Sequence, residues 1–294
     1  MGLTVHLVDG TYELFRYHFG VPAEVRAKGS RTAATRGVVG SVLGLLEGGA
    51  THVGVATDHV IESFRNAMWP GYKDGSGVDP DLLAQFGPVE DALRALGVVV
   101  WAMVDHEADD ALASAAATTV ADDRVDQVVI CTPDKDLGQC VVGQRVVQLD
   151  RRHDVVLDEA GVVAKFGVHP ESIPDWLALV GDSADGFPGL KGWGAKAAAA
   201  VLARYRHLEE IPRLGERWDL DVRGARSLAN VLNEQRDLAL LFRDLATLRL
   251  APPVLAAVDD LRWAGPTPAF TEICAAFDAH RLPERAEALA ATRV

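Results

Sequence analysis

Four short apolar runs, each leading into an acidic residue, constrain the fold of this 294-residue chain more than any other feature. The runs are rich in β-branched residues, which favours strands, and helix-like segments lie between them. Alternating strands and helices predict an α/β fold with a mostly parallel sheet and flanking helices. The predicted strands cover residues 3–8, 52–57, 98–104 and 127–132, and the predicted helices cover 35–46, 80–96 and 109–120.

The acidic residues that follow these runs predict a cation site. In open α/β sheets, ligands bind beyond the carboxyl ends of the strands, where Asp9, Asp58, residues 105–110 and residues 134–136 are expected. One such acid alone is more often a helix cap or a turn residue. Two like charges ~4 Å apart repel by about 4 kcal/mol at an effective dielectric near 20, so a group of acids needs cations or raised pKa values. Oxygen ligands without a nearby cysteine indicate Mg²⁺ or Mn²⁺ rather than zinc.

A second stretch, residues 181–196, combines carboxylates with a glycine-rich loop. Asp182 and Asp185 are three residues apart, a spacing that puts both on one side of a helical turn. The loop then leads into a run of helix formers, residues 195–204, and free backbone N–H groups at a helix start can bind an anion. The loop residues expected to meet phosphate are Gly189, Lys191, Gly192, Gly194 and Lys196.

Residues 59–80 are rich in glycine and proline, which predicts a mobile excursion over the strand ends. Arg65, Tyr72 and Lys73 supply a cation, an aromatic ring and a second cation, which could meet a phosphate and stack on a base. The alternative is a solvated loop with a tryptophan in the core.

Composition and charge limit the class of protein. A net charge of −13 argues against nucleic acid when taken alone, but two or three bound divalent ions would add about four to six positive charges locally. The three cysteines show no Cys-x-x-Cys spacing, which argues against a disulfide framework or a thiolate zinc site and favours a reducing cytoplasm. We expect no signal peptide, because no cationic flank precedes the first apolar run, and no membrane span, because no apolar run approaches ~20 residues.

The pattern becomes helical after residue 150. We predict helices over 158–166, 174–180, 195–204, 227–248 and 267–291, and hence a first domain over 1–160 and a helical second domain over 161–294.

The motifs taken together carry a family resemblance. They are Val8-Asp9-Gly10, Asp58, Ser63-Phe64-Arg65, Gly71-Tyr72-Lys73, Glu107-Ala108-Asp109-Asp110, Thr132-Pro133-Asp134-Lys135-Asp136-Leu137, and residues 181–185 and 188–196. In this order and spacing the chain resembles the flap endonuclease and 5′-to-3′ exonuclease family, which includes the 5′-nuclease domain of bacterial DNA polymerase I. The resemblance spans residues 1 to about 205, with weaker support to about 250. It implies a PIN-like α/β domain, a flexible arch at about 59–80, and a helix–three-turn–helix DNA-binding module at about 174–205.

The resemblance also implies roles for particular residues. The first metal site would use Asp9, Asp58, Glu107, Asp109 and Asp110, and the second would use Asp134, Asp136, Asp182 and Asp185. Lys73 and Arg65 would contact the scissile phosphate, and Tyr72 would contact DNA. The glycine-rich loop would hold the duplex backbone with a K⁺ bound by the backbone carbonyls of Leu179, Val180, Pro188, Leu190 and Trp193.

The implied activity is hydrolysis of phosphodiesters at 5′ flaps and 5′ ends in DNA replication and repair, with two or three Mg²⁺ or Mn²⁺. The implied partner is a 5′-flap, nicked or gapped duplex, bound by a cytoplasmic monomer. The chain departs from the family pattern at Ser183, Ser76 and Gly138, where an acid, an arginine and an aromatic residue are common.

Four alternatives stay open. The first two are a non-catalytic DNA-binding paralogue and an RNA-directed nuclease of related fold. Gly192-x-Gly194-x-x-Ala197 fits a dinucleotide fingerprint, although that motif normally follows a strand, and here it follows a loop that contains proline. Asp9-Gly10-Thr11 faintly resembles a haloacid-dehalogenase-type phosphatase, whose second aspartate would stand where this chain has Leu7.

Overall fold

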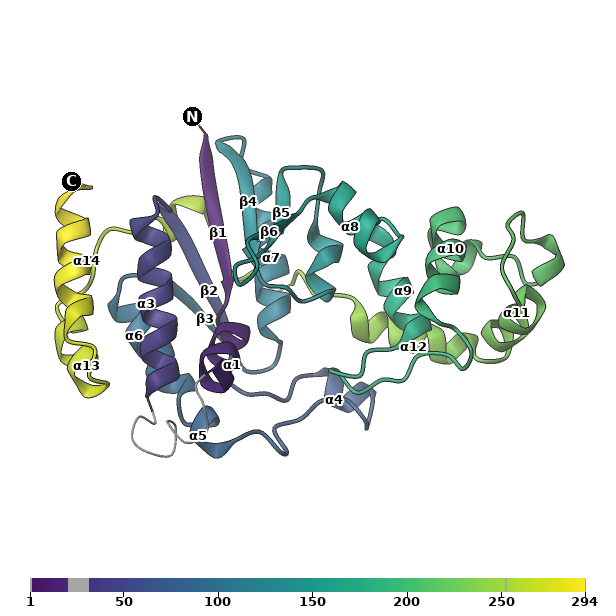
Figure 1. The fold of residues 1–294 in the computed structure, drawn as a ribbon, viewed down its shortest axis with the longest axis horizontal. Coiled ribbons are helices and arrows are strands. Elements are labelled where there is room, and N and C mark those ends of the chain that lie inside the picture. Colours follow the sequence, from purple (N-terminus) through teal and green to yellow (C-terminus); the bar gives the residue numbers. More distant parts are fainter. Residues whose placement is uncertain (1, 21–31, 252, 294) are drawn as a thin grey trace. The chain divides into compact units, whose positions relative to one another are not determined.

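The computed structural model describes residues 2–20, 32–251 and 253–293 of the chain, which forms two compact units (Figure 1). The first unit comprises Met1–Ile61, Gly75–Thr132 and Leu250–Val294, and the second comprises Glu62–Asp74 and Pro133–Arg249. This division differs from the predicted domains 1–160 and 161–294. The second unit takes a segment from the N-terminal half of the chain, and the first unit takes the last 45 residues, 250–294.

The strands described in the first unit form a parallel sheet with the order β3-β2-β1-β4. They are β1 (Leu3–Asp9), β2 (His52–Asp58), β3 (Val99–Met103) and β4 (Val125–Cys131). The predicted strands are therefore confirmed. In the central strand, β1, Val5, Leu7 and Val8 are fully buried and lie on both faces, as expected of a parallel strand covered from two sides.

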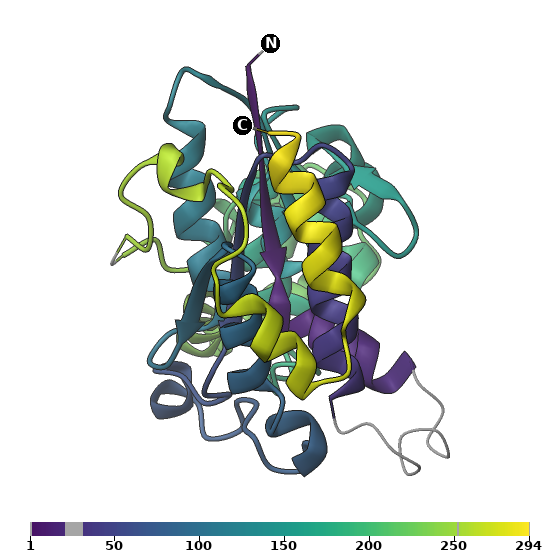
Figure 2. The ribbon, with the colours of Figure 1, turned by 90° about the vertical axis from the view of Figure 1, so that its left-hand side faces the viewer.

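Helices pack against this sheet and against one another. Figure 1 shows α3 and α6 on one side of the sheet and α7 on the other. Helices α13 and α14 contact α6 and α3, which places the C-terminal helices in the first unit (Figure 2). The helices of this unit are α1 (Gly10–Gly20), α3 (Ala33–Glu47), α5 (Pro80–Leu83), α6 (Phe86–Ala95), α7 (Ala108–Val120), α13 (Phe270–Ala276) and α14 (Arg281–Ala291).

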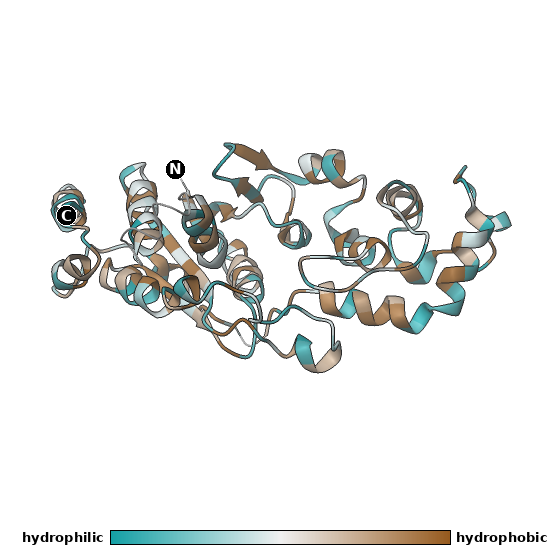
Figure 3. Cartoon of the chain, turned by 60° about the horizontal axis from the view of Figure 1, so that its bottom comes forward, coloured by the Kyte–Doolittle hydropathy of each residue, from teal (hydrophilic) through white to brown (hydrophobic). Residues whose placement is uncertain are grey.

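The second unit is mainly helical. Its antiparallel hairpin, β5 (Val146–Asp150) and β6 (Val155–Leu157), precedes a core in which α9 contacts both α10 and α12. Figure 3 shows hydrophobic and hydrophilic residues alternating along these helices, as expected when one side of each helix is buried. The helices are α4 (Arg65–Met68), α8 (Glu159–Phe166), α9 (Ile173–Val180), α10 (Ala195–Tyr205), α11 (Ala225–Glu234) and α12 (Arg236–Ala246).

Short 3₁₀ helices complete the connections. They are η1 (Asp136–Cys140), η2 (Pro170–Ser172), η3 (Leu208–Glu210) and η4 (Gly215–Arg217) in the second unit, and η5 (Val258–Leu261) in the first. Among the residues that the structure describes, every helix is too short or too polar to cross a bilayer.

Several predicted boundaries were wrong. The predicted helix 227–248 is two helices, α11 and α12, which meet at Gln235. The predicted helix 267–291 is also two helices, and Asp278 between them adopts a left-handed φ of 56°. A break of one to four residues does not disturb the apolar periodicity, so the pattern could not show it. Helix α1 and the β5–β6 hairpin were not predicted.

Candidate functional site

The acids at the ends of β1 and β2 also stabilise helix starts. Asp9 ends β1, and its carboxylate accepts a hydrogen bond from the backbone N of Tyr12 (2.8 Å) and another from the Thr132 hydroxyl (2.9 Å). The Tyr12 bond caps α1, where the helix dipole favours a negative charge. Gly10 follows at once because a Cβ there would lie 2.8 Å from the carbonyl oxygen of Ala56 in β2.

Asp58 at the end of β2 is tied to the start of α7. Its Oδ1 accepts a hydrogen bond from the backbone N of Ala108 (2.7 Å), and its own backbone N donates to the Thr11 hydroxyl (2.8 Å). The backbone N of Glu107 donates to Asp110 Oδ2 (3.0 Å), and both of these side chains are buried. The start of α7, to which Asp58 is hydrogen-bonded, therefore carries Glu107, Asp109 and Asp110. We call Asp9, Asp58, Glu107, Asp109 and Asp110 the strand-end acids.

Glu90 on α6 was not predicted as a functional residue, yet it braces the end of β2. It is 2% exposed and accepts hydrogen bonds from the Thr57 hydroxyl (2.8 Å) and from His59 Nδ1 (2.9 Å). Thr57 and His59 flank Asp58, so these bonds fix the backbone on both sides of that acid. In the sequence, Glu90 could have been identified as a glutamate on the buried side of an amphipathic helix.

A second group of acids lies in the second unit. Carboxylate oxygens of Asp136, Asp182 and Asp185 lie within 4.8 Å of one another, and all three side chains are buried. We call these residues the buried triad. Asp136 Oδ1 has no hydrogen-bond partner among the residues that the structure describes, although buried polar atoms are normally paired. An oxygen-only donor set with an unused acceptor fits a hard divalent cation such as Mg²⁺ or Mn²⁺.

Neighbouring groups affect the charges of the buried triad. Burial and the nearby carboxylates of Asp134, Asp185 and Asp182 raise the pKa of Asp136 well above its ordinary value. Lys135 Nζ lies 2.5 Å from Asp182 Oδ2, and Lys73 Nζ lies 3.0 Å from Asp185 Oδ1. Lys73 and Lys135 therefore offset part of the repulsion among the acids, and a divalent cation could take over this role.

The turn that carries Asp182 and Asp185 is closed tightly. The backbone N of Asp182 donates to the Phe187 carbonyl (2.8 Å), and the backbone N of Lys73 donates to the Asp185 carbonyl (2.9 Å). Gly186 has a φ of 85°, and a Cβ there would lie 2.0 Å from the Gly71 carbonyl oxygen. Glycine is required at this position because the backbone of the segment 62–74 packs directly against the turn.

The loop between α9 and α10 is tightly packed against the end of α9. A Cβ at Gly189 would lie 2.3 Å from the backbone N of Gly181, and the backbone N of Leu190 donates to the Leu179 carbonyl (2.9 Å). Trp193 is buried and donates through Nε1 to the Leu228 carbonyl (3.2 Å), which ties the loop to α11. Lys191, Gly192, Gly194 and Lys196 are exposed around the start of α10. The K⁺ and phosphate contacts stay predictions.

Part of the excursion predicted at 59–80, the segment 62–74, packs against the core of the second unit. Tyr72 is 5% exposed and belongs to the hydrophobic core of the second unit. Arg65 is 1% exposed and donates through Nε to the Leu245 carbonyl (2.8 Å) and through Nη2 to the Thr247 carbonyl (3.2 Å). The predicted contacts of Arg65 with a phosphate and of Tyr72 with DNA stay predictions, and in this structure both side chains serve packing.

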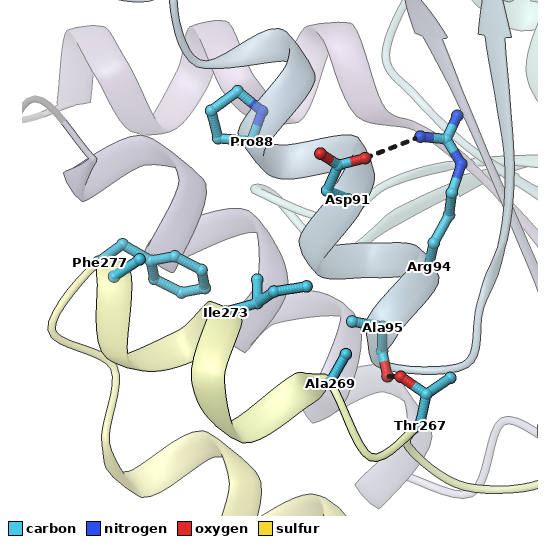
Figure 4. A pocket seen from close by; sticks show the side chains of 9 residues that line it. Pro88, Asp91, Arg94, Ala95, Thr267, Ala269, Ile273 and Phe277 are labelled. Atoms are coloured by element: carbon cyan, nitrogen blue, oxygen red, sulfur yellow. Dashed lines mark hydrogen bonds and ion pairs between the residues drawn. The ribbon is translucent and has the colours of Figure 1, made fainter.

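A groove between α6 and α13 lies apart from the acids. It encloses about 490 Å³ and is lined mainly by apolar side chains, including Pro88, Ile273 and Phe277 (Figure 4). Its charged groups are Asp91 and Arg94, which pair with each other at 3.3 Å. This groove contains none of the predicted site residues.

The chain thus combines a parallel sheet whose strands end in acids with a helical unit that carries a buried triad and a glycine-rich loop. The chain matches two family models, described as "5′-3′ exonuclease, N-terminal resolvase-like domain" over residues 4–167 and "5′-3′ exonuclease, C-terminal SAM fold" over residues 168–269. The chain therefore belongs to the 5′-3′ exonuclease family. The predicted family and fold class are confirmed.

Two relatives illustrate the range of this family. DNA polymerase I of Pseudomonas aeruginosa is 34% identical over 265 residues, which cover 87% of this chain and 28% of that protein. A 5′-3′ exonuclease of Aquifex aeolicus is 31% identical over 217 residues, which cover 73% of this chain and 74% of that protein. The chain thus spans about a quarter of the polymerase and most of the exonuclease.

Solved structures with a similar fold support the architecture. A mutant of T5 5′-exonuclease has a TM-score of 0.63 at 17% identity, covering 98% of this chain and 99% of the T5 chain. The catalytic core of Rad2 in complex with a DNA substrate has a TM-score of 0.64 at 15% identity, covering 98% of this chain and 92% of the Rad2 chain. At such low identity the likeness concerns the fold.

Proposed function

We propose that this chain is a divalent-metal-dependent DNA nuclease that hydrolyses phosphodiesters at 5′ flaps and 5′ ends. The observation that carries the proposal is the buried triad, with the unpartnered Asp136 Oδ1 and a lysine from the segment 62–74 paired to Asp185. Family membership supports the reaction class, since the Aquifex relative is named a 5′-3′ exonuclease.

Each group of acids would hold metal ions. The strand-end acids would bind one, and the buried triad together with Asp134 would bind another, with two or three Mg²⁺ or Mn²⁺ in all. Such ions supply activation of a water and stabilisation of the leaving oxygen. The chain orients its carboxylates through helix caps, through the Thr132 hydroxyl and through the bond from the backbone N of Asp136 to Asp134 Oδ1 (3.0 Å).

Lys73 would stabilise charge on the reacting phosphate. Its ammonium pairs with Asp185, and its backbone is fixed on the same residue, so the side chain is held beside the triad. A fixed cation aimed at developing negative charge lowers the barrier because it needs no reorganisation during the reaction. Asp185, which pairs with this lysine, would also be one of the residues that hold a metal ion.

The start of α10 would hold the duplex backbone. Its exposed N-terminus and the flanking Lys191 and Lys196 offer N–H groups and positive charge to phosphates, and carbonyls of the preceding loop would bind K⁺. The chain carries a net charge of −13, so these local cations and the bound metals must supply the attraction to DNA. The proposal places the enzyme in the cytoplasm as a monomer.

The test is incubation of the full chain with a 5′-labelled flap duplex, with and without Mn²⁺. We expect metal-dependent products that carry a 5′ phosphate, and Asp136→Asn should reduce cleavage by roughly 10²-fold or more. Asp219→Asn is the matched control, since Asp219 is an exposed aspartate of the same unit that pairs with Arg204. Cleavage without metal would contradict the proposal. DNA binding without cleavage would favour the non-catalytic paralogue, and preference for an RNA flap would favour the RNA-directed nuclease.

A further inference from the structure

The last turn of α12 binds side chains from two distant parts of the chain. The carbonyls of Leu245 and Thr247 accept hydrogen bonds from Arg65, and the carbonyl of Ala246 accepts one from Gln139 Nε2 (2.9 Å). The last carbonyls of a helix have no partner within the helix and carry partial negative charge. A guanidinium and an amide donor therefore satisfy groups that would otherwise be left unpaired.

Arg65 connects this helix end to the segment that carries Lys73. The arginine lies in α4 and is 1% exposed, and a buried charge is costly unless it is hydrogen-bonded, as this one is to the end of α12. Trp69, one turn later, packs edge-on against Phe242 of α12 with ring centroids 5.1 Å apart. Asn66 Nδ2 donates to the Lys73 carbonyl (2.9 Å), which closes the segment on itself. The position of Lys73 thus depends on contacts that begin at α12.

Gln139 makes the corresponding connection to the buried triad. Its Nε2 also donates to the Asp136 carbonyl (2.8 Å), and its Oε1 accepts a hydrogen bond from the backbone N of Leu248 (3.1 Å). One amide side chain therefore joins η1, which begins at Asp136, to both sides of the end of α12.

We propose that the carbonyl end of α12 is an anchor that sets Lys73 and Asp136 in place, with Arg65 and Gln139 as positioning residues. Arg65 then acts through Lys73, in contrast to the direct phosphate contact that the family resemblance implies. The effect on catalysis rests on the proposed function, whereas the effect on the order of the chain does not.

Hydrogen exchange of the full chain, without metal or DNA, tests the anchor directly. Arg65→Ala should speed exchange of the amides of Trp69, Tyr72 and Lys73 by about tenfold or more, because these amides are bonded within the docked segment or to Asp185. Core amides of α9 report that the second unit is still folded. Arg65→Lys should be intermediate, since it keeps the charge at the helix end but loses the two-point geometry.

Arg249→Ala is the matched control for the arginine. Its guanidinium lies 5.4 Å from the centroid of Phe64, the residue next to Arg65, and it pairs with Asp244 on the surface. This change should leave exchange at residues 69–73 unaltered. Wild-type exchange at these amides in Arg65→Ala would overturn the proposal.

Gln139→Ala tests the other half of the anchor. It should speed exchange of the amides of Gly138 and Val141, which are bonded within and after η1, and leave that of Lys73 unaltered. Unchanged exchange at Gly138 and Val141 would remove Gln139 from the anchor.

A double-mutant cycle then separates positioning from direct contact. If Arg65 acts through Lys73, the double variant Arg65→Ala/Lys73→Ala should cleave a flap duplex at the rate of Lys73→Ala alone, with KM little changed. Multiplication of the two single effects would indicate direct phosphate contact and overturn the positioning role. If the wild-type chain shows no cleavage, the proposed function fails, and the exchange experiment still decides whether the anchor exists.

Discussion

The negative charges of the strand-end acids in the first unit and of the buried triad in the second are stabilised in different ways. Asp9 and Asp58 accept hydrogen bonds from backbone N–H groups at the starts of α1 and α7, so their charges are stabilised by the fold itself. The triad relies on Lys73, Lys135 and a raised pKa at Asp136. The charges of Asp9 and Asp58 are therefore stabilised by secondary structure, whereas those of the triad are balanced by neighbouring side chains.

Among the variants compared, loss of Lys73 should have the largest effect on cleavage. Lys73→Ala should reduce the single-turnover cleavage rate of a 5′-flap duplex by roughly 10²- to 10³-fold, because a fixed cation beside the triad is removed. Binding of the duplex should change by less than about threefold, since phosphate contacts elsewhere carry the affinity. Lys165→Ala, which removes a lysine that lies over Phe166, serves as the control and should cleave normally. Full cleavage by Lys73→Ala would remove the lysine from the mechanism.

The next effect concerns the brace behind Asp58. Glu90→Ala should raise the Mn²⁺ concentration needed for half-maximal cleavage by about 10- to 100-fold, the range found when outer partners of metal ligands are lost. Glu90→Gln should raise this concentration less, because its amide oxygen can still accept the hydrogen bond from the Thr57 hydroxyl. Calorimetric titration of Mn²⁺ into the protein without DNA checks the same shift independently of activity. Identical titrations for wild type and Glu90→Ala would contradict the brace.

Without metal, loss of an acid should change protein stability in opposite directions in the two groups. Asp9→Ala removes the cap of α1 and should lower the free energy of unfolding by about 1 kcal/mol. Asp136→Asn removes a buried acid from among other acids and should raise the melting temperature in EDTA. Thermal unfolding of both variants in EDTA measures the contrast. A lower melting temperature for Asp136→Asn would show that its carboxyl group stabilises the fold.

The smallest effect is a pH dependence in the absence of metal. Burial and neighbouring carboxylates raise the pKa of Asp136, so between the unfolded and folded pKa values the native state binds more protons than the unfolded state. This residue's contribution to stability is therefore present at low pH and is lost as the pH rises above the ordinary value of 3.8 through the folded pKa. Melting temperatures in EDTA between pH 5 and 8 should decline less steeply in Asp136→Asn than in wild type, and parallel curves would contradict this.

Some features of this protein follow from the sequence alone. Hydrophobic periodicity, β-branched composition and turn residues are local properties of the sequence. The four strands β1–β4 and the start of α10 could therefore be predicted. The acids that end the strands could also be identified, because in a parallel sheet all carboxyl ends lie on one edge. The resemblance carried by these motifs led to the family that the comparisons confirmed. The convergence of the two groups of acids in one pocket stays a prediction.

The tertiary structure decided the rest, because it depends on contacts between residues far apart in the chain. Glycine and proline in residues 59–80 predicted an excursion, and local sequence did not show that Arg65 and Trp69 pack against α12, some 180 residues further on. Glu90 can bond to Thr57 only because α6 packs beside β2. Gln139 can bond to Ala246 only because η1 packs against the end of α12. Local sequence determines which elements form and which chemical groups are available. The partner of each buried polar group is decided only when the elements pack, since an unpaired donor or acceptor is costly in the interior.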